Sequence, residues 1–344
     1  MYSSFAYLIW DVDPEIIQIL GRGIRYYGLF FAIGFLLAQQ LSYYTFQQIK
    51  IPKKQVDRLS IYVFIGILIG ARLGHVVFYD PGYYFSHPAE IIRIDRGGLA
   101  SHGGLIGVFI GAYLFVRKYK LNPKQVYDRI VPAALLLSCL IRTGNLMNSE
   151  IYGNPTQTSK GIVFAYPSLK LLRDHLQASQ VLIQRKPTSD SIIVNLKYPQ
   201  NMPLSQVEKQ LRHRISVLSK TSAFLDHFDP AYQLQVQSQQ GRLLLHMNPI
   251  PRHPTQLYEA IVYFLLLISF LYLMKKNPRL PHGTYTGALL ISVFLSRAII
   301  EIWKVPQEEF NPLWGINMGQ WLSLPCILLG IKLLYPFLKR PKYT

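Results

Sequence analysis

The stretch Val131-Pro-Ala-Ala-Leu-Leu-Leu-Ser-Cys-Leu140 is almost wholly apolar, and it continues through Ile141 into the polar segment Arg142-Thr-Gly-Asn145-Leu-Met-Asn148-Ser-Glu150-Ile-Tyr-Gly153. A long apolar run is typical of a membrane-spanning helix. The segment after it places a guanidinium, two amides and a carboxylate within about three helical turns. Such groups are costly in lipid unless they pair internally or line a ligand cavity. The stretch therefore predicts a membrane helix that ends in a site for an anionic lipid. The alternative is that Arg142 extends to the interface and the asparagines cap the helix.

The composition also indicates a membrane protein. Of the 344 residues, 50% are hydrophobic and only 16% are charged, whereas soluble domains carry about 25% charged residues. The net charge of +18 fits contact with anionic lipid surfaces. Nucleic acid is the other partner that such a charge suggests. We expect no nucleic-acid partner, because the basic residues lie mostly between apolar runs rather than on one compact domain.

Seven apolar segments are candidates for membrane spans. They cover residues 27–44, 59–78, 103–115, 131–147, 257–274, 286–303 and 320–337. The third and fourth are short or polar at one end, which predicts broken or re-entrant helices. The chain start, residues 1–16, lacks the features of a signal peptide, so we expect an uncleaved extramembrane segment.

Basic residues follow the first, third and fifth candidate spans and close the chain. They are Lys50, Lys53, Lys54, Arg58, Arg117, Lys118, Lys120, Lys124, Arg129, Lys275, Lys276, Arg279, Lys339, Arg340 and Lys342. The loops between the other spans have a more balanced charge. Because cytoplasmic loops carry the excess of lysine and arginine, we expect the N-terminus outside and the C-terminus in the cytoplasm.

Residues 154–250 are mainly polar and contain no spanning run. Alternating residues predict strands over 191–198, 232–237 and 242–247, with a turn at Gln240-Gly241. Apolar residues recur every three or four positions over 204–218, which predicts a helix. The fold prediction is an all-α polytopic membrane protein of about seven transmembrane helices, with a small α+β extracytoplasmic head inserted between spans four and five. Its parts are a membrane body over 1–153, the head over 154–250, and a second membrane body with a basic cytoplasmic tail over 251–344.

The segment Asp95-Arg-Gly-Gly-Leu-Ala-Ser-His102-Gly103-Gly104-Leu-Ile-Gly107 contains the next candidate group. Histidine transfers protons near neutral pH, so His102 is a candidate general base for a thiol or hydroxyl nucleophile. Gly103 and Gly104 would let the backbone approach a ligand closely. The other interpretation is an interfacial histidine with glycines that allow tight helix packing.

A third group lies in Arg252-His253-Pro-Thr-Gln256-Leu-Tyr-Glu259. Pro254 predicts the end of the head and the start of a helix, which places Gln256 and Glu259 on one early face. A basic loop before a capped helix, with Glu259 favourable to the helix dipole, would give the same pattern.

Arg72 and Tyr27 lie near the ends of their predicted spans that the topology places outside, as do Arg142, His102 and Arg252. This gathering predicts a phosphate-bearing lipid headgroup and a reaction at the outer leaflet. No cluster has metal-ligand spacing, and neither cysteine (Cys139 or Cys326) has such a partner, so we expect no metal, no cofactor and no disulfide framework.

Taken together, the His102, Arg142 and Arg252 segments resemble the bacterial prolipoprotein diacylglyceryl transferase family, in the order in which that family has them. The resemblance runs from Tyr27-Gly28 to Met318-Gly-Gln320. It implies transfer of the diacylglyceryl group of phosphatidylglycerol to the lipobox cysteine thiol of a preprolipoprotein signal peptide. A thioether forms and glycerol 1-phosphate leaves. It also implies a monomer in the bacterial cytoplasmic (inner) membrane.

Carried over by position, His102, Arg142, Arg252 and Tyr27 are implied catalytic residues. The resemblance and the residue pattern together predict the substrate-binding residues Arg142, Asn145, Asn148, Glu150, Gly153, Gly103, Gly104, Arg72, Gln256 and Glu259. Asp128 resembles an acid on the cytoplasmic side with a structural role.

The sequence departs from the family pattern at several positions. Ile141 replaces the usual glycine before the signature arginine, and Leu146 occupies a position usually taken by an aromatic residue. Lys304 and Gln307 replace arginine and aspartate. At position 304, lysine keeps the positive charge of the usual arginine but lacks its bidentate fork of donors.

The main rival function is a polytopic lipid transporter or flippase, because transporters also place arginines at broken helices. They usually have repeat symmetry, which this sequence lacks. A structural scaffold is the third possibility, and it leaves the gathered arginines unexplained.

Overall fold

The structure is a computed structural model. It describes residues 7–19, 22–93, 97–156, 161–176, 180–185, 192–197, 209, 213, 228, 235–239, 242–305 and 318–339. Two compact units make up the chain. The first unit comprises Met1–Phe30, Ile141–Ala260 and Ile300–Asn317, and the second comprises Phe31–Leu140, Ile261–Ile299 and Met318–Thr344.

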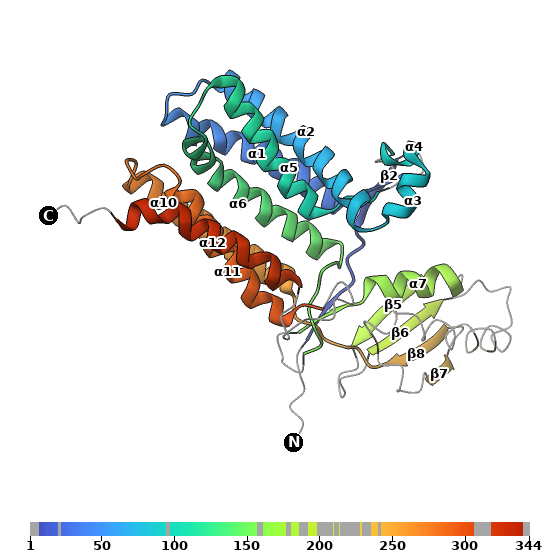
Figure 1. The fold of residues 1–344 in the computed structure, drawn as a ribbon. Coiled ribbons are helices and arrows are strands. Elements are labelled where there is room, and N and C mark those ends of the chain that lie inside the picture. Colours follow the sequence, from blue (N-terminus) through green and yellow to red (C-terminus); the bar gives the residue numbers. More distant parts are fainter. Residues whose placement is uncertain are drawn as a thin grey trace. The chain divides into compact units, whose positions relative to one another are not determined.

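Six of the described helices are long and apolar enough to cross a membrane. They are α1 (Tyr26–Gln47), α2 (Lys53–Phe78), α6 (Pro123–Met147), α10 (Thr255–Lys276), α11 (Thr284–Ile300), which a 3-10 turn continues to Trp303, and α12 (Met318–Leu338) (Figure 1). Large apolar side chains remain exposed along them, such as Leu36 on α1 and Leu328 on α12. Exposed apolar surface on long apolar helices is what lipid contact requires, so the predicted polytopic membrane fold is confirmed.

The segment predicted as the third span forms α5 (Ser101–Tyr119), a continuous helix of 19 residues that packs along α2. Glycines explain the close approach of the two helices. A Cβ atom on Gly66 would lie 2.2 Å from the carbonyl oxygen of Gly107, and one on Gly103 would lie 2.1 Å from that of Gly70. The expectation of broken helices over the third and fourth spans is wrong, because α6 is also continuous over 25 residues. The total of seven spans stays a prediction.

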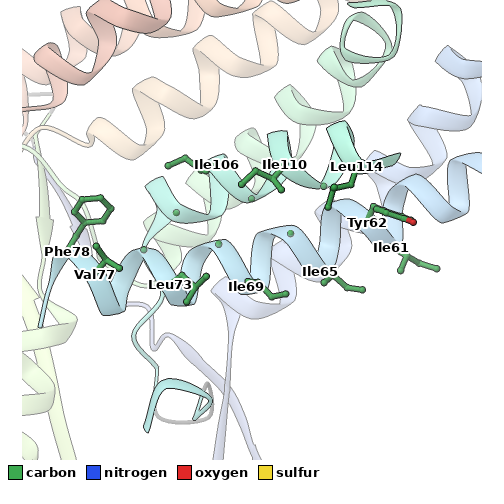
Figure 2. A pocket seen from close by; sticks show the side chains of 16 residues that line it. Ile61, Tyr62, Ile65, Ile69, Leu73, Val77, Phe78, Ile106, Ile110 and Leu114 are labelled. Carbon is green, nitrogen blue, oxygen red and sulfur yellow. The ribbon is translucent and has the colours of Figure 1, made fainter. Parts of the chain in front are cut away.

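An apolar groove of about 510 Å³ runs along the line where α2 and α5 meet. Its walls are isoleucine and leucine side chains of the two helices, including Ile69, Leu73 and Ile110, and glycines form its floor (Figure 2). The groove is open because the glycines on its floor have no side chains to fill it, and because they let the two helix backbones touch.

Two hydrophobic clusters hold the second unit together, and α6 contributes to both. One contains Phe46 of α1, Phe115 of α5 and Val126 of α6. The other contains Leu135 of α6 and Tyr263 of α10, among others. The short helices α3 (Pro81–Ser86) and α4 (Pro88–Ile91) follow α2.

Asp128 lies buried on α6 and caps the N-terminus of α11. Its carboxylate accepts hydrogen bonds from the Gly283 amide at 2.7 Å, the Thr286 amide at 2.8 Å and the Thr286 hydroxyl at 2.7 Å. Free amides at a helix start need such acceptors, and the helix dipole favours the negative charge. This geometry agrees with the structural role that the resemblance implied.

The variant Asp128→Ala is expected to lower the free energy of unfolding by about 2–4 kcal/mol, because it removes a charged acceptor and leaves buried donors unpaired. Thermal unfolding in detergent would measure the loss. Asp174→Ala, which changes an exposed aspartate of helix α7 (Tyr166–Leu176), is the control. Equal unfolding temperatures for the two variants would rule out a capping role.

The first unit contains the strands. Strands β1 (Leu8–Trp10) and β4 (Ile162–Phe164) form a parallel pair, and β2 (Glu15–Ile19) and β3 (Arg22–Arg25) form an antiparallel pair. A four-stranded antiparallel sheet has the order β5 (Gln180–Arg185), β6 (Ile192–Lys197), β8 (Arg242–Met247), β7 (Gln235–Gln239). Helix α7 (Tyr166–Leu176) precedes β5.

Alternate residues of β6 explain the core of this sheet. Ile192, Val194 and Leu196 are fully buried with Leu172 of α7 and Leu245 of β8, as the period of two requires. The strands predicted within 191–198, 232–237 and 242–247 are therefore confirmed where they are described. The predicted helix over 204–218 and the turn at Gln240-Gly241 lie outside the described residues, apart from positions 209 and 213, which are helical. The boundaries predicted at 153 and 250 stay a prediction.

Candidate active site

Arg142 lies in the last turns of α6, where the chain turns from helix to loop. The helix ends at Met147, and Ser149 and Ile151 have left-handed backbone angles with φ of 55° and 59°. Arg142 Nη1 donates to Asn145 Oδ1 at 3.3 Å, one helical turn further along. The amide of Glu150 then bonds to the carbonyl of Asn145 at 3.0 Å. The polar segment therefore folds back on the end of its own helix.

Glu259 of α10 is fully buried and connects two cations. Its Oε2 lies 2.7 Å from Arg142 Nε, and its Oε1 lies 2.9 Å from Lys304 Nζ. Lys304 Nζ also lies 3.6 Å from Oε2 of Glu301. Glu301 is the first residue of the 3-10 helix η2 (Glu301–Trp303). These four residues, which we call the ion network, have a net charge of zero. Buried charges persist only when paired in this way.

The ion network fixes the orientation of Arg142. Its side chain is 14% exposed, and its Nε and Nη1 have the partners Glu259 and Asn145. A guanidinium held along one edge presents its other donors in a defined direction, which suits bidentate binding of phosphate oxygens.

Lys304 was seen in the sequence only as a departure from a family pattern. In the structure it is 8% exposed, and its backbone forms an isolated β-bridge with Gly153. A lysine ammonium has three donors, which is enough to reach both carboxylates. The signal that could have identified it was the glutamate three positions earlier, Glu301.

Arg252 is buried and contacts the loop at Gly153. Its Nη1 donates to the Gly153 carbonyl at 3.2 Å, and its guanidinium lies 5.1 Å from the centre of the Tyr152 ring. Its backbone pairs with Ile162, at 2.9 and 3.0 Å. A Cβ on Gly153 would lie 2.3 Å from the Trp303 carbonyl, so only glycine fits there. Arg252 and Gly153 therefore lie together, and this geometry gives Arg252 a role in shaping the loop.

Gln256 is fully buried and donates from Nε2 to the Glu150 carbonyl at 2.8 Å. Its Oε1, Asn148 Oδ1 and Ser149 Oγ are buried and have no hydrogen-bond partner within the described residues. Asn148 Nδ2 in turn donates to Glu150 Oε1 at 3.2 Å. Buried polar atoms without a partner are costly, so these three atoms are available to water or to hydroxyl groups of a ligand.

Two aromatic residues pack against His253, which was not among the predicted site residues. The His253 ring lies 6.2 Å from that of Tyr258 and 6.3 Å from that of Trp303, measured between centroids, and its Nδ1 is 3.2 Å from the Tyr258 hydroxyl. Burial lowers the pKa of His253, because an apolar environment disfavours the charged form. This imidazole lies next to Arg252 in the chain.

Tyr27 lies at the start of α1 and belongs to the same unit as Arg142. A Cβ on Gly144 would lie 3.1 Å from Tyr27 Cα, so this glycine lets the end of α6 approach Tyr27 closely. The structure therefore brings together Tyr27, Arg142, Asn145, Asn148, Glu150, Gly153, Arg252, Gln256 and Glu259 within the first unit.

The remaining predicted residues belong to the second unit. His102 is the second residue of α5, and Gly103 packs against the backbone of α2. A Cβ on Gly104 would make only ordinary contacts, the nearest at 3.6 Å. The tight-packing interpretation therefore applies to Gly103. The gathering of His102 and Arg72 with Arg142 stays a prediction.

Comparison with known proteins identifies the family. Residues 14–336 match the family described as prolipoprotein diacylglyceryl transferase. A phosphatidylglycerol–prolipoprotein diacylglyceryl transferase of Tolumonas auensis is 34% identical over 328 residues, which cover 95% of this chain and 96% of the relative. The chain belongs to the prolipoprotein diacylglyceryl transferase family.

Two further relatives bear the same name. The protein of Bacteroides fragilis is 33% identical, with 96% of this chain and 95% of the relative covered, and that of Chloroherpeton thalassium is 33% identical, with 98% and 97% covered. Membership of the transferase family and the six apolar helices together show a bacterial multi-pass membrane protein.

Proposed function

We propose that this protein transfers the diacylglyceryl group of phosphatidylglycerol to the lipobox cysteine thiol of a preprolipoprotein signal peptide, in lipoprotein biogenesis. The family match over residues 14–336 carries the proposal. The relatives are named for phosphatidylglycerol and prolipoprotein. The orientation of Arg142 by the fully buried Glu259 supports a phosphate site in the first unit.

The reaction requires a base that accepts the thiol proton and donors that stabilise the leaving phosphate. The thiolate sulfur attacks the primary glycerol carbon that bears the phosphate, a C–S bond forms, and the C–O bond to the phosphate breaks. The thiol proton leaves to a base, for which His102 is the candidate. Glycerol 1-phosphate departs with the electron pair. Arg142 stabilises the negative charge on the leaving phosphate through donors already fixed in place.

The other predicted residues support this step. Asn145, Asn148 and Gln256 bind the lipid headgroup through hydroxyl and ester oxygens. Glu259 acts through Arg142, which it orients. Glu150 and Gly153 shape the loop after α6, and Arg252 holds that loop in place through the Gly153 carbonyl. Tyr27 packs at the end of α6, Gly103 sets the start of α5 by packing on α2, and Gly104 lets the backbone approach the ligand closely.

The topology belongs to the same proposal. Helix α5 completes seven spans, and the sheet β5–β6–β8–β7 lies in an extracytoplasmic head inserted after the fourth. The N-terminus is outside and the C-terminus is in the cytoplasm, because basic residues gather after α1, α5 and α10 and at the chain end. The protein acts as a monomer in the cytoplasmic membrane, without cofactor or metal.

The test uses the purified full-length protein in vesicles that contain phosphatidylglycerol, together with a lipobox peptide. Mass spectrometry is expected to show a diacylglyceryl thioether on the peptide cysteine, and glycerol phosphate in equal amount. A peptide with serine in place of that cysteine, and vesicles of phosphatidylethanolamine, are the controls. Movement of labelled phosphatidylglycerol between leaflets without any thioether product would favour a flippase and overturn the proposal.

A further inference from the structure

Arg72 is a buried cation within α2 whose donors are directed at main-chain carbonyls. It is 5% exposed. Its Nε donates to the Ile91 carbonyl at 2.7 Å and its Nη2 to the Glu90 carbonyl at 2.5 Å. Its Nη1 donates to the carbonyls of Gly97 and Gly98, at 2.8 and 3.0 Å. A guanidinium has five N–H donors, so these hydrogen bonds leave little capacity for a substrate phosphate.

The two glycines have backbone conformations that suit this arrangement. Gly97 and Gly98 have φ of +85° and +77°, a region that L-residues with a side chain rarely adopt. A Cβ on Gly98 would lie 2.6 Å from Arg72 Nη1 and 2.7 Å from the ring of His75. A Cβ on Gly97 would have nothing within 4 Å. A side chain at position 98 would therefore collide with the guanidinium, whereas one at position 97 would not.

The contacts of Arg72 lie immediately before α5. Ala100, the N-cap residue of α5, donates its amide to the carbonyl of Ala71, the neighbour of Arg72, at 2.9 Å. Gly103 of α5 then packs against Gly70 and Gly74 of α2. One face of α2 thus fixes residues 97–103 through side-chain, main-chain and packing contacts, and His102 lies within this stretch.

We propose that Arg72 is a positioning residue of the transferase. It holds residues 97 and 98 on α2, and so sets the first turn of α5 and the catalytic base that this turn carries. The inference rests on the proposed function, and it replaces the direct substrate contact predicted for Arg72 from the sequence. Since one charged side chain spans carbonyls from Glu90 to Gly98, its removal frees both the loop and the helix start.

Two glycine variants separate this role from backbone strain. Gly97→Ala and Gly98→Ala both place a side chain at positive φ, but only Gly98→Ala displaces the Arg72 guanidinium. We expect Gly98→Ala to lower kcat about 10- to 100-fold more than Gly97→Ala, because small misplacements of a catalytic group are costly. The KM for phosphatidylglycerol should be the same in both. Amide hydrogen exchange over residues 97–104 should be faster in Gly98→Ala.

Arg72→Lys and Arg72→Met complete the test. Lysine should recover part of the kcat that methionine loses, with KM unchanged. Equal kcat values for the two glycine variants would overturn the proposal, and so would an Arg72→Lys variant with raised KM and normal kcat, which would indicate direct substrate contact. If the wild type forms no thioether, the transferase proposal fails instead, and hydrogen exchange still decides whether Arg72 fixes the start of α5.

Discussion

Replacing Arg142 by lysine is expected to lower kcat by about 100- to 1,000-fold, the usual loss when a donor to a developing oxyanion is removed. The structure gives the reason. Arg142 contacts Glu259 through Nε at 2.7 Å and Asn145 through Nη1, and a guanidinium has further donors on its other edge. A lysine ammonium is one point charge on a flexible stem. If it pairs with the buried carboxylate of Glu259, it cannot also bind the phosphate in two places.

The measurement is the rate of thioether formation on a lipobox peptide at saturating phosphatidylglycerol. Arg173→Lys, an exposed arginine of α7 in the same unit, should retain wild-type turnover and so controls for the exchange of residue type. An unfolding temperature of Arg142→Lys close to that of the wild type would show that the loss is catalytic. Wild-type kcat in Arg142→Lys would exclude a bidentate phosphate contact.

The membrane fold was accessible from the sequence because its signal is local. Apolar runs of spanning length predicted the helices of Figure 1 to within a few residues at most of their ends, since the bilayer core sets that length. The error over α5 and α6 has a physical cause. The short length and polar end of these runs were interpreted as helix breaks, but α5 runs without a break from Ser101 to Tyr119, and the polar end of α6 remains helical as far as Met147.

The sequence predicted which residues belong to the site, but not which of them contact one another. Arg142, Gln256 and Glu259 were recognised as polar residues at helix ends, and the first unit does bring them together. The sequence could not show that Glu259 contacts Arg142 rather than a ligand, because the partners come from different helices. Arg72 illustrates the same limit. A buried arginine in a span indicates a costly charge, and only the fold shows that main-chain carbonyls satisfy it.

Glu259→Gln is expected to have the largest effect on stability, about 3–5 kcal/mol in the free energy of unfolding. Glu259 is fully buried between Arg142 and Lys304, at 2.7 and 2.9 Å. The glutamine amide is neutral, so Arg142 and Lys304 lose the carboxylate that they share, while Glu301 stays 3.6 Å from Lys304. Breaking a buried ion pair from one side costs about this much, because the remaining charge has lost both its solvation and its partner.

Thermal unfolding in detergent would give the loss, and Glu150→Gln provides the control, since Glu150 is exposed and in the same unit. The double variant Glu259→Gln/Lys304→Met should recover part of the stability, because it removes one of the two cations that lose the Glu259 carboxylate. Turnover should stay low in the double variant, since Arg142 still lacks the carboxylate that orients it. If Lys304→Met is no more stabilising in the Glu259→Gln background than in the wild type, Lys304 and Glu259 are not energetically coupled, and the ion network is not what holds Arg142 in place.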